Sequence, residues 1–187
     1  MLRLGFALTG SFCTFDKVFP VMEELAGEYE ITPIFSPVSA SVDSRFGRAE
    51  DFLRRAEAIC GRPALLEIAQ VEPIGPKQLL DLLLIAPCTG NTLGKIANGI
   101  TDTCVTMAYK SHLRNGRPAV LAVSTNDGLG TAAVNIGTLL NKKNAYFVPF
   151  GQDDAVNKPT SLVADFSRIP ETLAHALRGQ QIQPLLI

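Results

Sequence analysis

Two short segments of the chain combine glycine with hydroxyl and amide side chains directly after apolar runs. They are Thr9-Gly10-Ser11 and Thr89-Gly90-Asn91-Thr92. Each stands where a buried strand would pass into a helix, so backbone N–H groups and hydroxyls would face outward at a helix N-terminus. Such a place attracts anions, and the segments predict an anion-binding site at the strand ends. An ordinary tight turn with a helix cap accounts for the first segment equally well.

The second segment favours a binding site over a simple cap. Thr89 and Thr92 bring hydroxyls, Asn91 brings an amide, and Gly90 leaves the backbone open. Lys95 follows Asn91 by one helical turn and so shares its helix face. Capping alone needs one such residue, whereas four are present.

A third polar segment, Ser124 to Gly130, follows another apolar run. Taken alone, it is typical of a glycine-rich turn with an Asp or Asn cap. Ser124 and Asn126 nevertheless join the predicted site, because the ends of parallel strands meet at one edge of a sheet. Asp127 is the one carboxylate expected at that edge, and we nominate it as a general base.

Several other kinds of site are disfavoured. The chain lacks the G-x-G-x-x-G fingerprint of dinucleotide binding and an acidic residue placed to hold a ribose. No C-x-x-C pair occurs, and the two histidines lie far apart in sequence, so no metal site is expected. Cys88 could be a nucleophile, but no histidine partner can be read, and a small, partly buried residue is the better interpretation. We expect packing roles for the other cysteines, and helix surfaces for both histidines; these residues are Cys13, Cys60, Cys104, His112 and His175.

Three cations near the end of one predicted helix have two possible roles. Lys110, Arg114 and Arg117 could bind carboxylates. They could equally be partners of the helix dipole, because cations are common near helix C-termini.

Composition limits the class of protein. The chain has 187 residues, 47% of them hydrophobic and 19% charged, which suits one domain spanning 1–187. A net charge of -1 gives no reason to expect nucleic acid or an acidic membrane as partner. No apolar run is long enough to span a bilayer, and the first residues do not resemble a signal peptide. We therefore expect a cytoplasmic protein with reduced thiols.

Strand and helix patterns alternate along the chain. Apolar runs predict strands at 2–8, 31–35, 82–86, 119–123 and 145–148. Helical spacing predicts helices at 15–25, 49–59, 93–100, 105–113, 132–140 and 170–177. Thr14 would cap the first helix, Pro20 would kink or break it, and Gly61 would end the second. Segments 37–46, 72–77 and 151–160 are expected to be irregular, whereas Ala64 to Ile68 fits a strand or a helix.

This alternation predicts a three-layer α/β fold with a doubly wound parallel sheet. Ligands of such sheets bind beyond the carboxyl ends of the strands. The loops at 9–14, 87–92 and 124–130 are therefore the expected walls of the site.

Two motifs carry a resemblance to a known family. With Gly5-x-x-Leu8-Thr9-Gly10-Ser11 and Pro87-x-Thr89-x-Asn91-Thr92, the chain resembles the flavoprotein superfamily of flavin-dependent cysteine decarboxylases and flavin prenyltransferases. The resemblance implies a Rossmann-like fold, FMN or another phosphate-bearing ligand, Ser11 at the phosphate, and Asn91 at the flavin ring or a substrate carboxylate. It also implies a functional Asn126 and a homo-oligomer, because the flavin sites of that superfamily lie between subunits.

Within the superfamily, the chain is similar to the B subunits of dipicolinate synthases. The similarity runs from about residue 4 to 186 and includes Arg45-Phe46-Gly47, Glu72-Pro73-x-Gly75-Pro76-Lys77, Leu113-Arg114-Asn115-Gly116-Arg117-Pro118, Ser124 to Gly130 and Phe147 to Asp154. It implies oxidation of dihydrodipicolinate to dipicolinate in the mother cell of a sporulating bacterium, with a partner A subunit that carries NAD(P). Arg45 and Lys95 are the expected contacts to the dicarboxylate substrate.

The chain also departs from the decarboxylase pattern. Those enzymes have a histidine near the third strand and a cysteine in a late loop, and this chain has neither. Ser124-Thr125-Asn126-Asp127 stands where they have Pro-x-Met-Asn. Two other functions therefore stay open: a standalone FMN-dependent decarboxylase or prenyltransferase-like enzyme, and a non-catalytic subunit that stabilises its partner.

Overall fold

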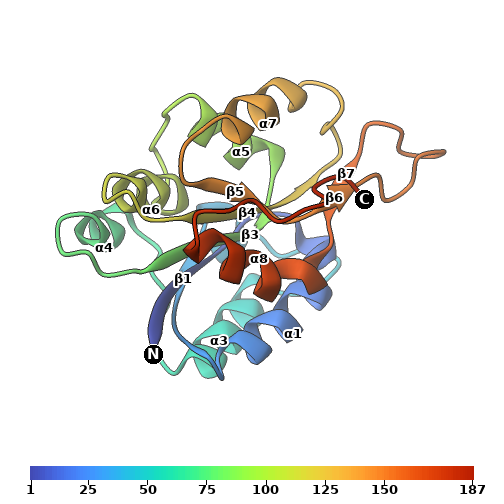
Figure 1. The fold of residues 1–187 in the computed structure, drawn as a ribbon. Coiled ribbons are helices and arrows are strands. Elements are labelled where there is room, and N and C mark those ends of the chain that lie inside the picture. The colour runs from blue at the N-terminus through green and yellow to red at the C-terminus, as the bar shows by residue number, and fades with distance from the viewer.

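Four parallel strands form the centre of the computed structural model, which describes residues 1–187 (Figure 1). They are β2 (Tyr29–Phe35), β1 (Leu2–Leu8), β3 (Leu82–Cys88) and β4 (Ala119–Thr125), side by side in that order. Every residue of β3 is buried, and all but the last of β4. Continuous apolar runs of this kind are typical of parallel strands that helices cover on both faces.

The far edge of the sheet is mixed. The short strand β5 (Ala145–Phe147) pairs in parallel with the start of β4, whereas β7 (Leu162–Ala164) pairs antiparallel with its last two residues. Strand β6 (Phe150–Gly151) adds to β7, and the C-terminal residues run beside β6. The sequence did not predict β6 and β7, because strands of two or three residues are too short for an alternating pattern.

Helices cover both faces of this sheet, so the three-layer α/β fold is confirmed. On one face lie α1 (Phe15–Leu25), α3 (Ala49–Cys60) and α8 (Ile169–Leu177), and on the other α5 (Gly90–Ala97), α6 (Cys104–Leu113) and α7 (Ala133–Leu140) (Figure 1). The shorter elements are η1 (Phe12–Thr14), α2 (Pro37–Ser41), α4 (Ile68–Val71), η2 (Glu72–Ile74) and η3 (Phe166–Arg168). None of the helices combines the length and apolar character needed to cross a membrane.

Helix α1 does not break at Pro20 as the sequence suggested. It is continuous from Phe15 to Leu25. Six of its apolar side chains are buried, and their packing outweighs the one backbone hydrogen bond that proline cannot donate. Thr14 stands at the cap position, but its hydroxyl donates to the Ser11 carbonyl at 2.8 Å and accepts no helix N–H.

Two segments expected to be irregular contain helical turns. Helix α2 occupies the start of 37–46, where the Ser36 hydroxyl accepts from the Ser39 N–H at 3.2 Å and Pro37 is the first helical residue. Residues 68–74 form α4 and η2. The ambiguous Ala64 to Ile68 forms no full strand or helix, although Leu65 makes a single bridge to Ile34 of β2.

A partly buried charge network closes the edge of the sheet opposite the strand exits. Asp81 accepts from Arg3 at 2.8 Å and from Arg117 at 3.0 Å. The hydrogen bond from Arg3 is the largest of the effects that lower the pKa of Asp81 to about 2. Arg117 is thus paired with Asp81, just before β3, and is not free to bind the carboxylate of a ligand.

His112 lies inside this end of the molecule and not on a helix surface, so its sequence prediction was wrong. It is fully buried, and Nε2 lies 2.9 Å from the Pro118 carbonyl, which can only accept. Nδ1 has no hydrogen-bond partner. Burial lowers the pKa of His112 to about 4, so the ring is neutral in the folded chain. His175 is half-buried on α8.

We expect His112 to reduce stability as the pH falls from about 6.5 to about 4. In this window the unfolded chain binds the proton and the folded chain does not, so acid favours unfolding. Between pH 7 and 4.5 the chain should lose about 2 kcal/mol more than its His112→Gln variant. Chemical denaturation at both pH values measures this difference, and His175→Gln is the control. Equal losses in the chain and in His112→Gln would contradict the prediction.

Candidate functional site

The two polar segments that follow β1 and β3 are in direct contact. The Thr9 side chain is buried, and its hydroxyl donates to the Pro87 carbonyl at 2.6 Å. The same oxygen accepts from the Thr89 N–H at 3.1 Å. One hydroxyl therefore joins the two strand ends, and the predicted meeting of these segments is a fact of the structure.

The third segment, after β4, meets both of the others. The hydroxyls of Ser11 and Ser124 are hydrogen-bonded at 2.7 Å. A Cβ atom on Gly90 would lie 2.6 Å from Thr125 Oγ1 and 2.8 Å from Asp127 Oδ1. The close approach of Thr125 and Asp127 therefore requires glycine at position 90.

Helix α5 begins at Gly90, three residues before the predicted start. Thr89 is its N-cap, and the Thr89 hydroxyl accepts from the Thr92 N–H at 3.3 Å. Asn91 and its neighbours thus form the first turn of a helix, where N–H groups have no acceptor within the helix. The positive end of the α5 dipole therefore faces the strand exits. Residues 87 and 88, predicted as part of the turn, continue β3.

A cavity of about 370 Å³, here called the Asn91 hollow, lies between α5 and α2. Its lining is mostly polar and consists of Thr9, Gly10, Ser36, Pro37, Val38, Thr89, Asn91, Thr92, Lys95 and Thr103. The Asn91 side chain is exposed and forms no hydrogen bond within the chain, so its amide is free for a ligand. Lys95 is already paired, with both Asp102 oxygens within 2.9 Å of Nζ.

A second cavity of about 550 Å³, the Ser124 hollow, shares Gly10 and Thr89 with the first. Ser11, Gly90, Ser124 and Asn126 line it, together with residues of α1, the 44–46 turn and the loop before β7. The Asn126 carbonyl accepts from the Thr160 hydroxyl at 2.7 Å, which holds its backbone while its side chain stays exposed.

Two predicted site residues line neither hollow. The Arg45 side chain is exposed, and its guanidinium lies over the Phe46 ring, 4.9 Å from the centroid. Asp127 accepts a hydrogen bond from the Thr125 hydroxyl and packs beside Gly90. The predicted substrate contact of Arg45 and the predicted general base Asp127 therefore have no support from the geometry. The other predicted residues are brought together at the two hollows.

The structure adds residues that sequence reasoning missed. Ser36 and Pro37 reach the Asn91 hollow from α2, and a Ser-Pro pair after a strand is a helix-start signal that could have been read. Lys17 and Lys158 line the Ser124 hollow. No local pattern marks these two lysines, because only the fold brings α1 and the loop before β7 to the same place.

The cysteines divide into buried and exposed thiols. Cys88 is fully buried, and burial raises the pKa of its thiol, which favours the expected inert role over a nucleophile. Cys13 is exposed in the Ser124 hollow, 3.8 Å from the Ser11 hydroxyl, so its predicted packing role was wrong. No histidine lines either hollow. The two hollows thus offer mainly hydroxyls, amides and lysines, which suit binding and orientation of an anion, and the Ser124 hollow adds Cys13 and Asp153.

Gly90→Ala should destabilise the chain by about 1–3 kcal/mol, because its Cβ would overlap Thr125 and Asp127. Gly137→Ala in α7 is the matched control, since no atom lies within 4 Å of its Cβ position. That control should be stabilising by about 0.5–1 kcal/mol, as alanine favours helix. Urea unfolding of both variants measures the contrast, and equal effects would refute the role of Gly90 at the crossing.

Comparison with known proteins identifies the family of the chain. Residues 1–149 match the family model named Flavoprotein. The B subunit of the dipicolinate synthase of Bacillus subtilis (strain 168) is 46% identical over 186 residues, which are 99% of this chain and 93% of the relative.

Solved structures agree in fold. The crystal structure of the dipicolinate synthase B subunit from Bacillus halodurans C has a TM-score of 0.91 at 45% identity, and the match covers 100% of this chain and 96% of that one. DmrB from Burkholderia xenovorans in complex with FMN has a TM-score of 0.70 at 20% identity, covering 95% and 96%, which shows a shared fold alone. The chain therefore belongs to the Flavoprotein family and, within it, to the dipicolinate synthase B subunits.

Proposed function

We propose that the chain acts with a dinucleotide-binding A subunit to oxidise dihydrodipicolinate to dipicolinate, pyridine-2,6-dicarboxylate, during spore formation in the cytoplasm of the mother cell. The observation that carries the proposal is 46% identity to the B subunit of a dipicolinate synthase over nearly the whole chain. A subunit so named implies a partner. We also expect the chain to assemble with copies of itself, as its superfamily resemblance implies.

The work divides between the two subunits. Making the ring aromatic removes a hydride and a proton from the substrate. The hydride acceptor in this proposal is NAD(P) on the A subunit, because the present chain has no dinucleotide fingerprint. This chain supplies the surface that orients the dicarboxylate.

The Asn91 hollow has the groups that orientation needs. The free Asn91 amide and the first turn of α5 can donate to one substrate carboxylate. Lys95 can bind the other carboxylate if that carboxylate replaces Asp102, the present partner of Lys95. No acidic side chain lines the Asn91 hollow, so in this proposal the chain orients the substrate and does not itself accept the proton there.

The Ser124 hollow fits the phosphate of a flavin. The Ser11 and Ser124 hydroxyls are hydrogen-bonded to each other, which leaves one of their two protons to donate to a ligand. Lys17 is positive and forms no ion pair, and Gly90 begins α5 with free N–H groups. The Flavoprotein match and the FMN complex of DmrB support this ligand. When bound, FMN would supply a hydride-accepting ring, and this chain's part is to hold its phosphate.

Ser124→Ala should weaken FMN binding by about tenfold or more, because a hydrogen bond to a charged group is lost. Ser41→Ala is the control, since this exposed serine donates to Pro37 and lies outside both hollows. Quenching of flavin fluorescence in a titration measures the dissociation constants. Equal affinity of both variants for FMN would show that the phosphate does not bind at Ser124.

Two other functions are distinguishable by experiment. A standalone flavin enzyme is favoured by the Flavoprotein match, and it would be yellow and active without a partner. The missing histidine and late cysteine oppose it, since His112 is buried at the other edge of the sheet. A non-catalytic subunit would show no heat of binding with either FMN or dipicolinate in calorimetry.

Asn91→Ala should lower turnover at least about tenfold when the chain is reconstituted with its A subunit, because the substrate carboxylate loses a charge-assisted hydrogen bond. Asn141→Ala, an exposed residue outside both hollows, is the matched control. Dipicolinate formation measured by its absorbance reports the result. Full turnover with Asn91→Ala would remove this residue from the mechanism.

A further inference from the structure

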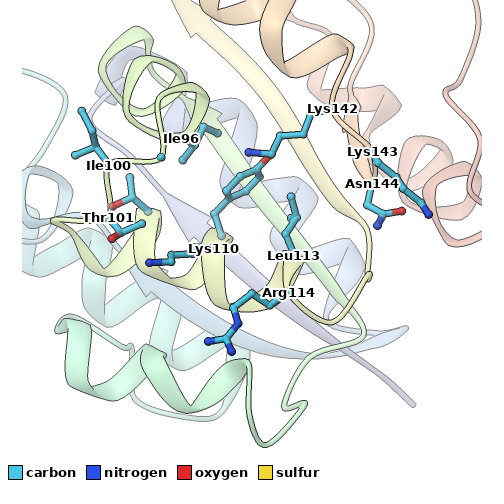
Figure 2. Close-up of a pocket in the computed structure, with 12 residues that line it drawn as sticks. Ile96, Ile100, Thr101, Lys110, Leu113, Arg114, Lys142, Lys143 and Asn144 are labelled. Carbon is cyan, nitrogen blue, oxygen red and sulfur yellow. The ribbon is translucent and has the colours of Figure 1, made fainter.

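A third cavity, of about 480 Å³, lies over helix α6 and shares no lining residue with the two hollows (Figure 2). We call it the α6 groove. Its walls come from the end of α5, one face of α6 and residues 142–144 before β5. On α6 the lining residues are Thr106, Tyr109, Lys110, Leu113 and Arg114. Their spacing of three and four places them on one helix face, so the groove runs along the helix.

The groove gathers positive charge that nothing in the chain neutralises. Nine of the 17 lysines and arginines form ion pairs. Four of the other eight line this groove, which are Lys110, Arg114, Lys142 and Lys143. No acidic residue lines it. In a chain with net charge -1, half of the unpaired cations thus lie at one cavity.

The helix dipole explains only part of this charge. Lys110 and Arg114 stand near the C-terminal end of α6, where cations are ordinary. Lys142 and Lys143 come from a different segment, after α7, and Figure 2 shows Lys142 reaching over the groove from that segment. Four like charges from two elements therefore line one cavity, and they would attract an anion.

Between the cations the groove is apolar. Ile96, Ile100, Leu113 and the Tyr109 ring form this part of its surface. Lys142 Nζ lies 5.8 Å from the centroid of the Tyr109 ring, so charge and aromatic face are adjacent. An apolar surface with a few charged groups is typical of pockets for small organic ligands, and this volume is in their range.

We propose that the α6 groove binds a small organic anion that has a flat apolar body and at least two negative charges. The body would lie against Ile100 and Leu113, and the charged groups would be held by Lys110, Arg114 and Lys142. A nucleoside diphosphate has this chemistry through its phosphates, and an aromatic dicarboxylate has it through its carboxylates. The site is separate from the two hollows and independent of the function proposed for them.

Calorimetric titration of the purified chain tests the proposal with three probes: ADP, pyridine-2,6-dicarboxylate and inorganic pyrophosphate. ADP or the dicarboxylate should bind at least about tenfold more tightly than pyrophosphate, which lacks an apolar body. The probe that binds more tightly to the Asn91→Ala variant, in which the Asn91 hollow is impaired, identifies the charged group recognised by the groove as phosphate or carboxylate. Binding should weaken as ionic strength rises.

A pair of double variants assigns the binding to the groove. Arg114→Gln with Lys142→Gln should weaken binding at least about tenfold, because two charge-assisted contacts are lost. Lys77→Gln with Arg178→Gln removes the same charge from exposed, unpaired residues outside the three cavities, and it should bind as the parent chain does.

Variants of the two hollows separate this site from the proposed function. Asn91→Ala and Ser124→Ala should leave the groove's affinity unchanged, whatever they do to turnover or FMN binding. The proposal is overturned if none of the probes binds or if pyrophosphate binds as tightly as the others. It is also overturned if both double variants lose affinity equally, or if Asn91→Ala or Ser124→Ala abolishes binding of every probe.

Discussion

The buried hydroxyl of Thr9 joins the ends of the two strands on which the candidate site stands. It donates to the carbonyl of Pro87 and accepts from the N–H of Thr89. Because both partners lie just before the start of α5, this contact sets the helix N-terminus against the exit of β1. The hydrogen bond between Ser11 and Ser124 then adds the exit of β4. The shape of both hollows depends on these few contacts.

The positions of the titratable groups suit the two hollows to ligand binding rather than to nucleophilic catalysis. Cys88 and His112, the thiol and imidazole that could do nucleophilic or acid–base chemistry, are fully buried, and burial favours their neutral forms. The strand exits carry mainly hydroxyls, amides and lysines, and Cys13 and Asp153 line only the Ser124 hollow. Such a surface suits the binding of an anionic ligand, which agrees with the proposed function.

Positive charge is distributed unevenly over the molecule. Arg3 and Arg117 are paired with Asp81 at the opposite edge of the sheet, and Lys95 with Asp102. Half of the unpaired cations line the α6 groove. A nearly neutral chain can therefore present two separate surfaces for anions, one rich in hydroxyls and one rich in lysine with an apolar floor.

The sequence alone determined the central strands, the main helices and the edge at which a ligand would bind. Strong apolar periodicity and polar strand exits are local signals, and β1 and β4 carry them clearly. Only the tertiary structure decided which polar residues face a cavity. It turned Asp127 toward Thr125, left Arg45 on the surface, buried His112, and brought Lys142 to α6. Which face of the fold each of these residues occupies depends on contacts between residues far apart in the chain, such as Gly90 with Thr125 and Lys142 with Tyr109, and the local sequence pattern does not predict them.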